Sequence, residues 1–171
     1  MTKGLPTGTN VSCACGSVVI EALGAPITSV SCYCDDCKEG ARQIEALPGA
    51  PAVQDPDGGT AYLVYRKDRV RYSKGASLVR NLKIKDKSAT NRVTATCCNS
   101  AMLLNFDDGK HWVDLYRSRC LGEVLPVQMR ICTKFKPANR DIPTDVPCHS
   151  RYPMSFVMKL LVAKAVMMFN R

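Results

Sequence analysis

The sequence lacks the short motifs of several common enzyme classes. It has no glycine-rich segment of the kind that cradles phosphates and no serine-nucleophile signature. It contains only two histidines, His111 and His149. His111 stands beside Trp112, which is typical of a packing or surface residue. His149 follows Cys148, but adjacency in the chain does not give side-chain contact, so the pair does not indicate nucleophilic catalysis.

Aromatic residues are also scarce, at 6% of 171 residues. The formal net charge is +9, and much of the excess lies between Arg66 and Arg92, where Tyr72 is the only aromatic residue. Proteins that bind single strands stack bases on aromatic side chains, so this composition argues against nucleic acid as a partner. A solvated face of β-strands explains the basic run best. The alternative is a surface that attracts a small anionic molecule.

No apolar run is long enough to cross a bilayer. The longest candidate, 155–169, has about 15 residues with two internal lysines, whereas a spanning helix needs about 20 apolar residues. Ser155 can cap this segment as a helix. The alternatives for the helix are docking on its own domain, docking on a second copy of the chain as a homo-oligomer, and lying on a membrane surface.

Disulfides are not expected. Residues 1–8 have no apolar core of the kind that a secretory leader carries, so we expect a cytoplasmic, reducing location. A chain of 171 residues with 46% hydrophobic content does not normally need disulfides for stability. The ten cysteines therefore call for an explanation as metal ligands, disulfides or scattered core residues.

The positions of the cysteines favour metal. Seven of the ten lie in three tight groups, which are Cys13 with Cys15, then Cys32, Cys34 and Cys37, then Cys97 with Cys98. Cys13 and Cys15 are too close in sequence to form an unstrained disulfide, but two thiolates at this spacing can converge on one ion. We therefore predict that these seven cysteines bind one or two Zn²⁺ ions. Cys120, Cys132 and Cys148 stand apart from the groups.

The three groups predict two kinds of site. Cys32, Cys34 and Cys37 supply three thiolates within six residues, and three protein ligands with one open position are typical of catalytic zinc. We therefore predict that this group is catalytic. The other two groups come from distant parts of the chain, so a metal between them would join an early strand to a late one. Since adjacent residues rarely point at the same ion, we expect one of Cys97 and Cys98 to be a ligand and the other a buried thiol.

The rest of the sequence predicts a mainly β protein of small antiparallel sheets. Strands are expected at 17–21, 27–32, 61–65, 70–72, 78–84, 92–96, 102–106 and 112–116. A short helix at 37–47 follows the second cysteine group, with Asp35 and Asp36 near its start as capping residues. Frequent prolines after Gly122 predict an irregular tail. We therefore divide the chain into a zinc-binding β domain, 1–120, and an extension with a C-terminal helix, 121–171, packed on the domain or on a partner.

The cysteine motifs resemble those of the glutathione-dependent formaldehyde-activating enzymes and their centromere protein V relatives. The resembling segments are the Cys-x-Cys-Gly motif at Cys13, the Cys-x-Cys-x-x-Cys motif at Cys32 and the Cys-Asn-Ser segment at Cys98. The resemblance implies an Mss4-like fold, a structural zinc on Cys13, Cys15 and Cys98, and a catalytic or exchangeable zinc on the middle motif. The chain departs from the family at Ala95, where the family has its first late cysteine, and at Asn99, where it has glycine.

Two functions follow from the resemblance and from the residues. One is a zinc-dependent enzyme of the carbon–sulfur lyase type, acting on a glutathione adduct or another thiol adduct, with Arg and Lys side chains holding the carboxylates of the adduct. The other is a non-catalytic, zinc-stabilised module that binds a protein or nucleic-acid partner. Metal analysis and thiol-adduct binding distinguish the two.

Overall fold

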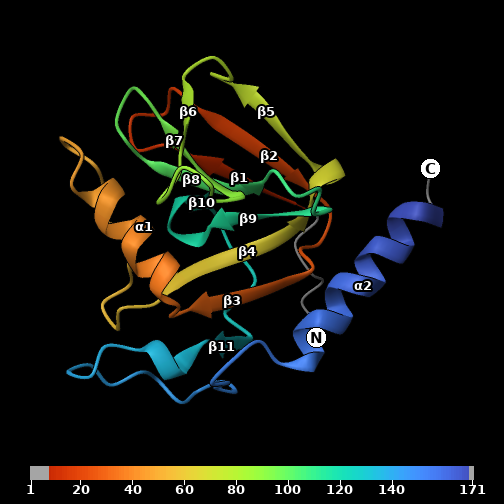
Figure 1. Ribbon diagram of the computed structural model, residues 1–171. Coiled ribbons are helices and arrows are strands. Elements are labelled where there is room, and N and C mark those ends of the chain that lie inside the picture. Colours follow the sequence, from red (N-terminus) through yellow and green to blue (C-terminus); the bar gives the residue numbers. More distant parts are fainter. Residues whose placement is uncertain (1–7, 170–171) are drawn as a thin grey trace.

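The computed structural model describes residues 8–169, which form two β-sheets and two α-helices (Figure 1). Residues 1–7 lie outside the described residues. They make up most of the segment from which we expected that the chain has no leader. The fold is mainly β, as predicted. The strands are β1 (Gly8–Ser12), β2 (Val19–Leu23), β3 (Thr28–Cys32), β4 (Thr60–Arg66), β5 (Val70–Lys74), β6 (Val79–Leu82), β7 (Thr90–Ala95), β8 (Ala101–Phe106), β9 (Trp112–Tyr116), β10 (Cys120–Leu121) and β11 (Met129–Ile131). The helices are α1 (Asp35–Glu45) and α2 (Met154–Phe169).

The larger sheet is buried on both faces. It has seven strands in the order β11-β3-β4-β9-β8-β7-β6, which makes it larger than the small sheets expected from the sequence. In its central strand β4, side chains alternate between the faces. Leu63 and Tyr65 pack in one apolar cluster, whereas Tyr62 and Val64 pack in another. The sheet therefore separates two hydrophobic cores.

The first core lies between the two sheets. The smaller sheet has four strands in the order β10-β1-β2-β5 and contributes Val11 and Ile20. The larger sheet contributes Leu63, Val93 and Leu115. All five side chains are almost completely buried. Burial of this apolar surface is the main force that holds the two sheets together.

The second core lies between the larger sheet and the helices. Helix α1 contributes Ala41 and Ile44, and α2 contributes Phe156 and Leu160. In Figure 1, α1 lies at the left of the larger sheet, whereas α2 starts to the right of β11 and extends away from the sheet. The ring of His111, just before β9, hydrogen-bonds the Leu160 carbonyl at 2.8 Å. His111 is therefore a packing residue, as the sequence suggested.

Three strands were missed by the sequence analysis, namely β1, β10 and β11. Strand β1 is rich in polar residues, and β10 has only two residues. Strand β11 lies within the tail predicted to be irregular, and it pairs in parallel with β3 so that Ile131 stands opposite Cys32. A parallel pair joins residues far apart in sequence, which no local pattern reveals.

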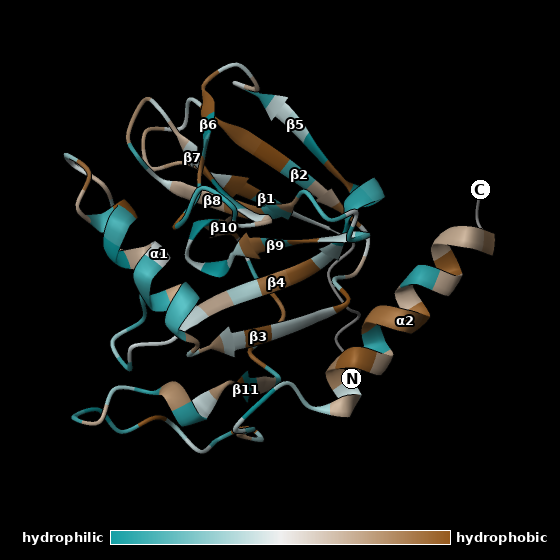
Figure 2. Cartoon of the chain, viewed as in Figure 1, coloured by the Kyte–Doolittle hydropathy of each residue, from teal (hydrophilic) through white to brown (hydrophobic). Residues whose placement is uncertain are grey.

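Helix α2 is rich in apolar residues, as the brown segments of Figure 2 show, and many of them are exposed. Its exposed hydrophobic residues are Met154, Val157, Met158, Leu161, Val162, Val166, Met168 and Phe169. Between residues 8 and 169, no helix is both long and apolar enough to cross a membrane. The predicted pairing of α2 with a second copy of the chain stays a prediction.

A substitution in α1 tests how closely the helix packs on the larger sheet. Gly40 faces Arg92 of β7, and a Cβ at this position would overlap the Arg92 guanidinium. Alanine normally stabilises a helix interior relative to glycine by about 1 kcal/mol. We expect Gly40→Ala instead to destabilise the protein by about 1–3 kcal/mol, because Arg92 is buried and must move. Denaturant unfolding measures the change.

The matched control is the same substitution in an Arg92→Ala background, where the space is free. There Gly40→Ala should be neutral or stabilising. Equal destabilisation in both backgrounds would contradict the packing.

Candidate metal centres and the adjoining pocket

Four cysteine sulfurs meet where the two sheets adjoin. The Sγ atoms of Cys13, Cys15, Cys97 and Cys98 all lie within 4.8 Å of one another. The distances from Cys97 Sγ are 3.9 Å to Cys13, 3.3 Å to Cys15 and 3.9 Å to Cys98. Sulfurs at the corners of a tetrahedron around zinc, with bonds of about 2.3 Å, are about 3.8 Å apart. The four cysteines, which we call the tetrad, can therefore hold one metal ion.

Two tight turns position the tetrad. In the turn after β1, the Gly16 amide donates to the Cys13 carbonyl at 3.0 Å and the Val18 amide donates to the Cys13 sulfur at 3.2 Å. The other turn follows β7, and Asn99 there has a φ of 53°. This left-handed conformation favours glycine, and asparagine tolerates it better than most residues. Asn99 is therefore compatible with the turn.

The structure brings both Cys97 and Cys98 to the site, whereas the sequence analysis expected only one of them there. Both sulfurs belong to the tetrad, and neither residue is buried. The turn between β7 and β8 reverses the chain, so adjacent residues can both point toward the turn after β1. Ala95, where the resemblance led us to expect a cysteine, is buried at the end of β7. Cys97 therefore supplies the fourth sulfur from a position two residues later.

Cys32, Cys34 and Cys37 form a second cluster, which we call the triad. Their sulfurs also lie within 4.8 Å of one another. Cys32 ends β3, and Cys34 is the N-cap of α1, where its sulfur accepts a hydrogen bond from the Cys37 amide at 3.4 Å. Asp35 and Asp36 lie in the first turn of the helix, so the predicted helix start is confirmed, but the capping residue is Cys34 and neither aspartate.

The triad favours a thiolate at Cys34. Hydrogen bonds from the thiols of Cys32 and Cys37 lower the pKa of Cys34 to about 3, and the amides at the start of α1 act in the same direction. In the tetrad, hydrogen bonds from Ser17 lower the pKa of Cys15 to about 6. Thiolate is the form that binds metals. Crowded free thiols with this property suit a soft divalent cation such as zinc.

Cys132 adjoins the triad, although the sequence analysis set it apart. It follows β11 directly, so the parallel pairing with β3 brings it next to Cys32, and its interaction with Cys32 lowers the pKa of Cys132. Its side chain is buried, and its backbone is left-handed with a φ of 59°. The isolated position of this cysteine in the sequence gave no signal of the contact. Cys120 and Cys148 lie in neither cluster.

A cavity of about 450 Å³ opens beside the triad. Small-molecule sites usually have volumes of about 300–1,000 Å³. All three triad cysteines line the cavity, together with residues of β4, β7, β8, β9 and the first turn of α2. The triad therefore has access to a space that a small molecule can occupy, which the sequence analysis could not show.

Two charged side chains of the larger sheet also line this cavity. Arg92 of β7 is almost fully buried and donates from Nη2 to the Asp36 carbonyl at 2.5 Å, while its Nη1 has no hydrogen-bond partner. Asp114 of β9 lies on the same face as Trp112 and Tyr116. Burial raises the pKa of Asp114 to about 7, and nearby Lys110 only partly offsets this effect. The alternation Trp-x-Asp-x-Tyr is the signal by which the sequence could have placed this carboxyl on the core face.

Fold and site together define a mainly β protein with two sulfur-only clusters, each able to hold a metal ion. Residues 8–47 match the sequence profile of the glutathione-dependent formaldehyde-activating enzyme family. The match contains five of the seven predicted ligands and confirms the resemblance over this part of the chain. No curated protein is significantly similar. A crystal structure of a protein from Rhodobacter sphaeroides, a structural-genomics target, is similar with 15% identity and a TM-score of 0.47, over 68% of this chain and 91% of that chain.

A first site prediction concerns the tetrad. Cys15→Ser should remove one metal ion per chain and lower the melting temperature by about 10 °C or more, because loss of a structural metal removes folding free energy. Elemental analysis and calorimetry of protein purified under reducing conditions measure both changes. Cys148→Ser is the control, since this exposed cysteine lies in neither cluster. Unchanged metal content in Cys15→Ser would contradict a metal at the tetrad.

A second site prediction concerns Asp114. In the unfolded chain its carboxyl ionises near pH 4, whereas in the folded protein its pKa is about 7. Ionisation therefore opposes folding increasingly between these values and fully above pH 7. Asp114→Asn should stabilise the protein by roughly 1–3 kcal/mol at pH 8 and have little effect at pH 4.

Asp107→Asn is the matched control. Hydrogen bonds from Lys83 and Asn91 lower the pKa of Asp107, so its replacement should not stabilise the protein at either pH. Denaturant unfolding at both pH values measures these effects. A stabilisation by Asp114→Asn that is equal at pH 4 and pH 8 would exclude the raised pKa.

Proposed function

We propose that the protein is a zinc-dependent enzyme of the carbon–sulfur lyase type, which acts on the adduct of a thiol and an aldehyde. The observation that carries the proposal is the position of the triad in the wall of the cavity. Three thiolates with one free coordination position are typical of zinc sites that perform chemistry, whereas four protein ligands are typical of structural sites. On this basis the tetrad has a structural role and the triad a catalytic one.

The residues of the triad would hold the ion at the start of α1. When bound there, zinc polarises the sulfur or oxygen of the adduct. Cys32 and Cys37 are buried, and the Tyr62 hydroxyl hydrogen-bonds Cys37 Sγ at 3.5 Å. These contacts fix the direction of the ligands and limit the access of water from the protein side.

Asp114 would move the proton of the reaction. Cleavage of a hydroxyalkyl thioether breaks the C–S bond, forms the C=O bond of the aldehyde and releases the hydroxyl proton. A carboxylate Oδ of Asp114 can accept this proton, and the thiol leaves as a thiolate. In the reverse direction the same oxygen returns the proton. A pKa of about 7 suits both directions near neutral pH.

The second candidate is a non-catalytic binding module. The exposed apolar residues of α2 favour it, because such surfaces commonly mark contacts with other molecules. In that case both metal ions would be structural, and the cavity would bind no thiol adduct.

Serine substitutions in the two clusters distinguish the candidates. We expect Cys34→Ser to reduce the exchange of ¹³C-formaldehyde between its free and thiol-bound forms by at least about 100-fold, because it removes a ligand of the catalytic ion. Its effect on stability should be milder than that of Cys15→Ser, since the triad closes only a short loop. NMR exchange spectroscopy and calorimetry measure the two properties, with Cys148→Ser as the control. Equal destabilisation by both substitutions, without exchange activity in the wild type, would favour the binding module.

A further inference from the structure

The walls of the cavity beside the triad are mostly apolar. Its apolar lining residues are Val30, Val64, Leu104, Phe106, Trp112, Ile131, Phe156 and Val157. They come from both sides of the cavity, since the sheet supplies the first six and the start of α2 supplies the last two. Such a surface favours a ligand that buries hydrocarbon, because each buried CH₂ contributes about 0.8 kcal/mol.

The charged groups of the lining do not suit a ligand with several charges. Lys110 forms an ion pair with Asp108, and its Nζ lies 4.7 Å from the centre of the Phe106 ring. Arg92 is held by the Asp36 carbonyl, and its unpartnered Nη1 is shielded from solvent. Asp36 and Asp114 add two carboxyl groups to the same lining. Glutathione carries two carboxylates and an ammonium group, and Lys110 and Arg92 would have to give up their present contacts before they could pair with its carboxylates.

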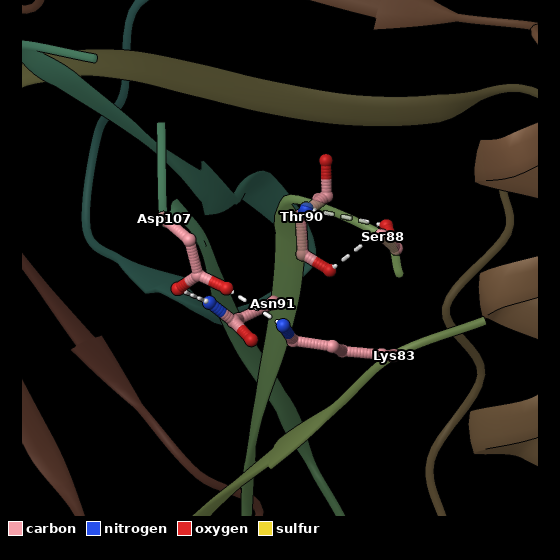
Figure 3. Close-up of polar contacts among 5 residues, drawn as sticks. All are labelled: Lys83, Ser88, Thr90, Asn91 and Asp107. Carbon is pink, nitrogen blue, oxygen red and sulfur yellow. Dashed lines mark hydrogen bonds and ion pairs between the residues drawn. The ribbon is translucent and has the colours of Figure 1, made fainter. Parts of the chain in front are cut away.

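The rim of the cavity at β7 and β8 is held in place by a polar network (Figure 3). Asp107, which follows β8, accepts hydrogen bonds from Asn91 Nδ2 at 2.7 Å and from Lys83 Nζ at 2.6 Å. Ser88 Oγ accepts from the Thr90 amide at 3.2 Å and fixes the turn before β7. Thr90 and Phe106, which stand opposite each other in the two strands, both line the cavity. The apolar wall is therefore preformed, as small-molecule sites usually are.

We propose that this cavity binds a small apolar thiol, or the aldehyde adduct of one, in preference to glutathione. The choice of a sulfur compound rests on the proposed function, whereas the preference for an apolar carbon skeleton rests on the cavity walls alone. Asp114 would then contact the hydroxyl oxygen of the adduct. The adduct of an apolar thiol has no other polar group, so no further charge has to be desolvated.

Three ligands separate the two parts of the proposal. Benzyl mercaptan has the apolar group and the thiol, benzyl alcohol has the apolar group alone, and glutathione has the thiol with charged groups. Isothermal calorimetry with the zinc-loaded, full-length protein under anaerobic conditions measures their affinities. We expect benzyl mercaptan to bind at least about tenfold more tightly than either of the others, a difference of about 1.4 kcal/mol.

Each result decides one part. Tighter binding of glutathione than of benzyl mercaptan would overturn the apolar preference and leave the proposed function intact. Equal binding of benzyl alcohol and benzyl mercaptan would overturn the sulfur chemistry and leave the apolar preference intact. The absence of binding by all three would overturn both.

The substitution Phe106→Ala tests whether the ligand binds in the cavity. It should weaken the binding of benzyl mercaptan by about tenfold, because it removes one aromatic wall. Phe135→Ala is the matched control, since Phe135 is also partly buried beside a lysine but does not line the cavity. Equal affinities for the two variants would show that the ligand binds elsewhere and would overturn the proposal.

Discussion

The tetrad joins the two sheets at the point where the turn after β1 meets the turn after β7. Hydrophobic burial between the sheets is non-directional, so it does not by itself fix how one sheet is placed on the other. A metal ion held by the four sulfurs, which lie within 4.8 Å of one another, would fix this placement, because it accepts only a narrow range of distances. The larger sheet then presents its second face to α1 and α2. The cavity lies on that face.

The triad depends on a different set of neighbours. Its cysteines lie at the junction of β3 and α1, and they need both the capping geometry of the helix and the parallel pairing of β3 with β11. Strand β11 belongs to the C-terminal part of the chain, as do the residues of α2 that line the cavity. The part expected to be an extension therefore contributes directly to the candidate site. Its buried Cys132 brings an additional thiol to the triad from this direction.

Much of the fold was predictable because it depends on local patterns in the sequence. Alternating β-branched and apolar residues gave most of the strands, and Asp35 with Asp36 indicated the start of α1. The cysteine spacing grouped all seven residues that the structure brings together, since short motifs act through short loops. What could not be predicted depends on long-range contacts. The contact of Cys132 with Cys32 requires the parallel β11–β3 pair, and the burial of Arg92 requires that α1 lie over β7 at Gly40. Cys97 and Cys98 both reach the tetrad because the chain turns at Asn99.

The central claim is that each of the two clusters holds a zinc ion and that all ligands from the protein are cysteine sulfurs. X-ray absorption at the zinc edge of the purified protein tests this claim most directly, because it reports the type, number and distance of the ligands of the metal. The account predicts two zinc ions per chain with sulfur at about 2.3 Å, and an average of between three and four sulfurs per ion. Protein purified under reducing conditions that contains no zinc, or zinc surrounded mainly by nitrogen and oxygen, would contradict it.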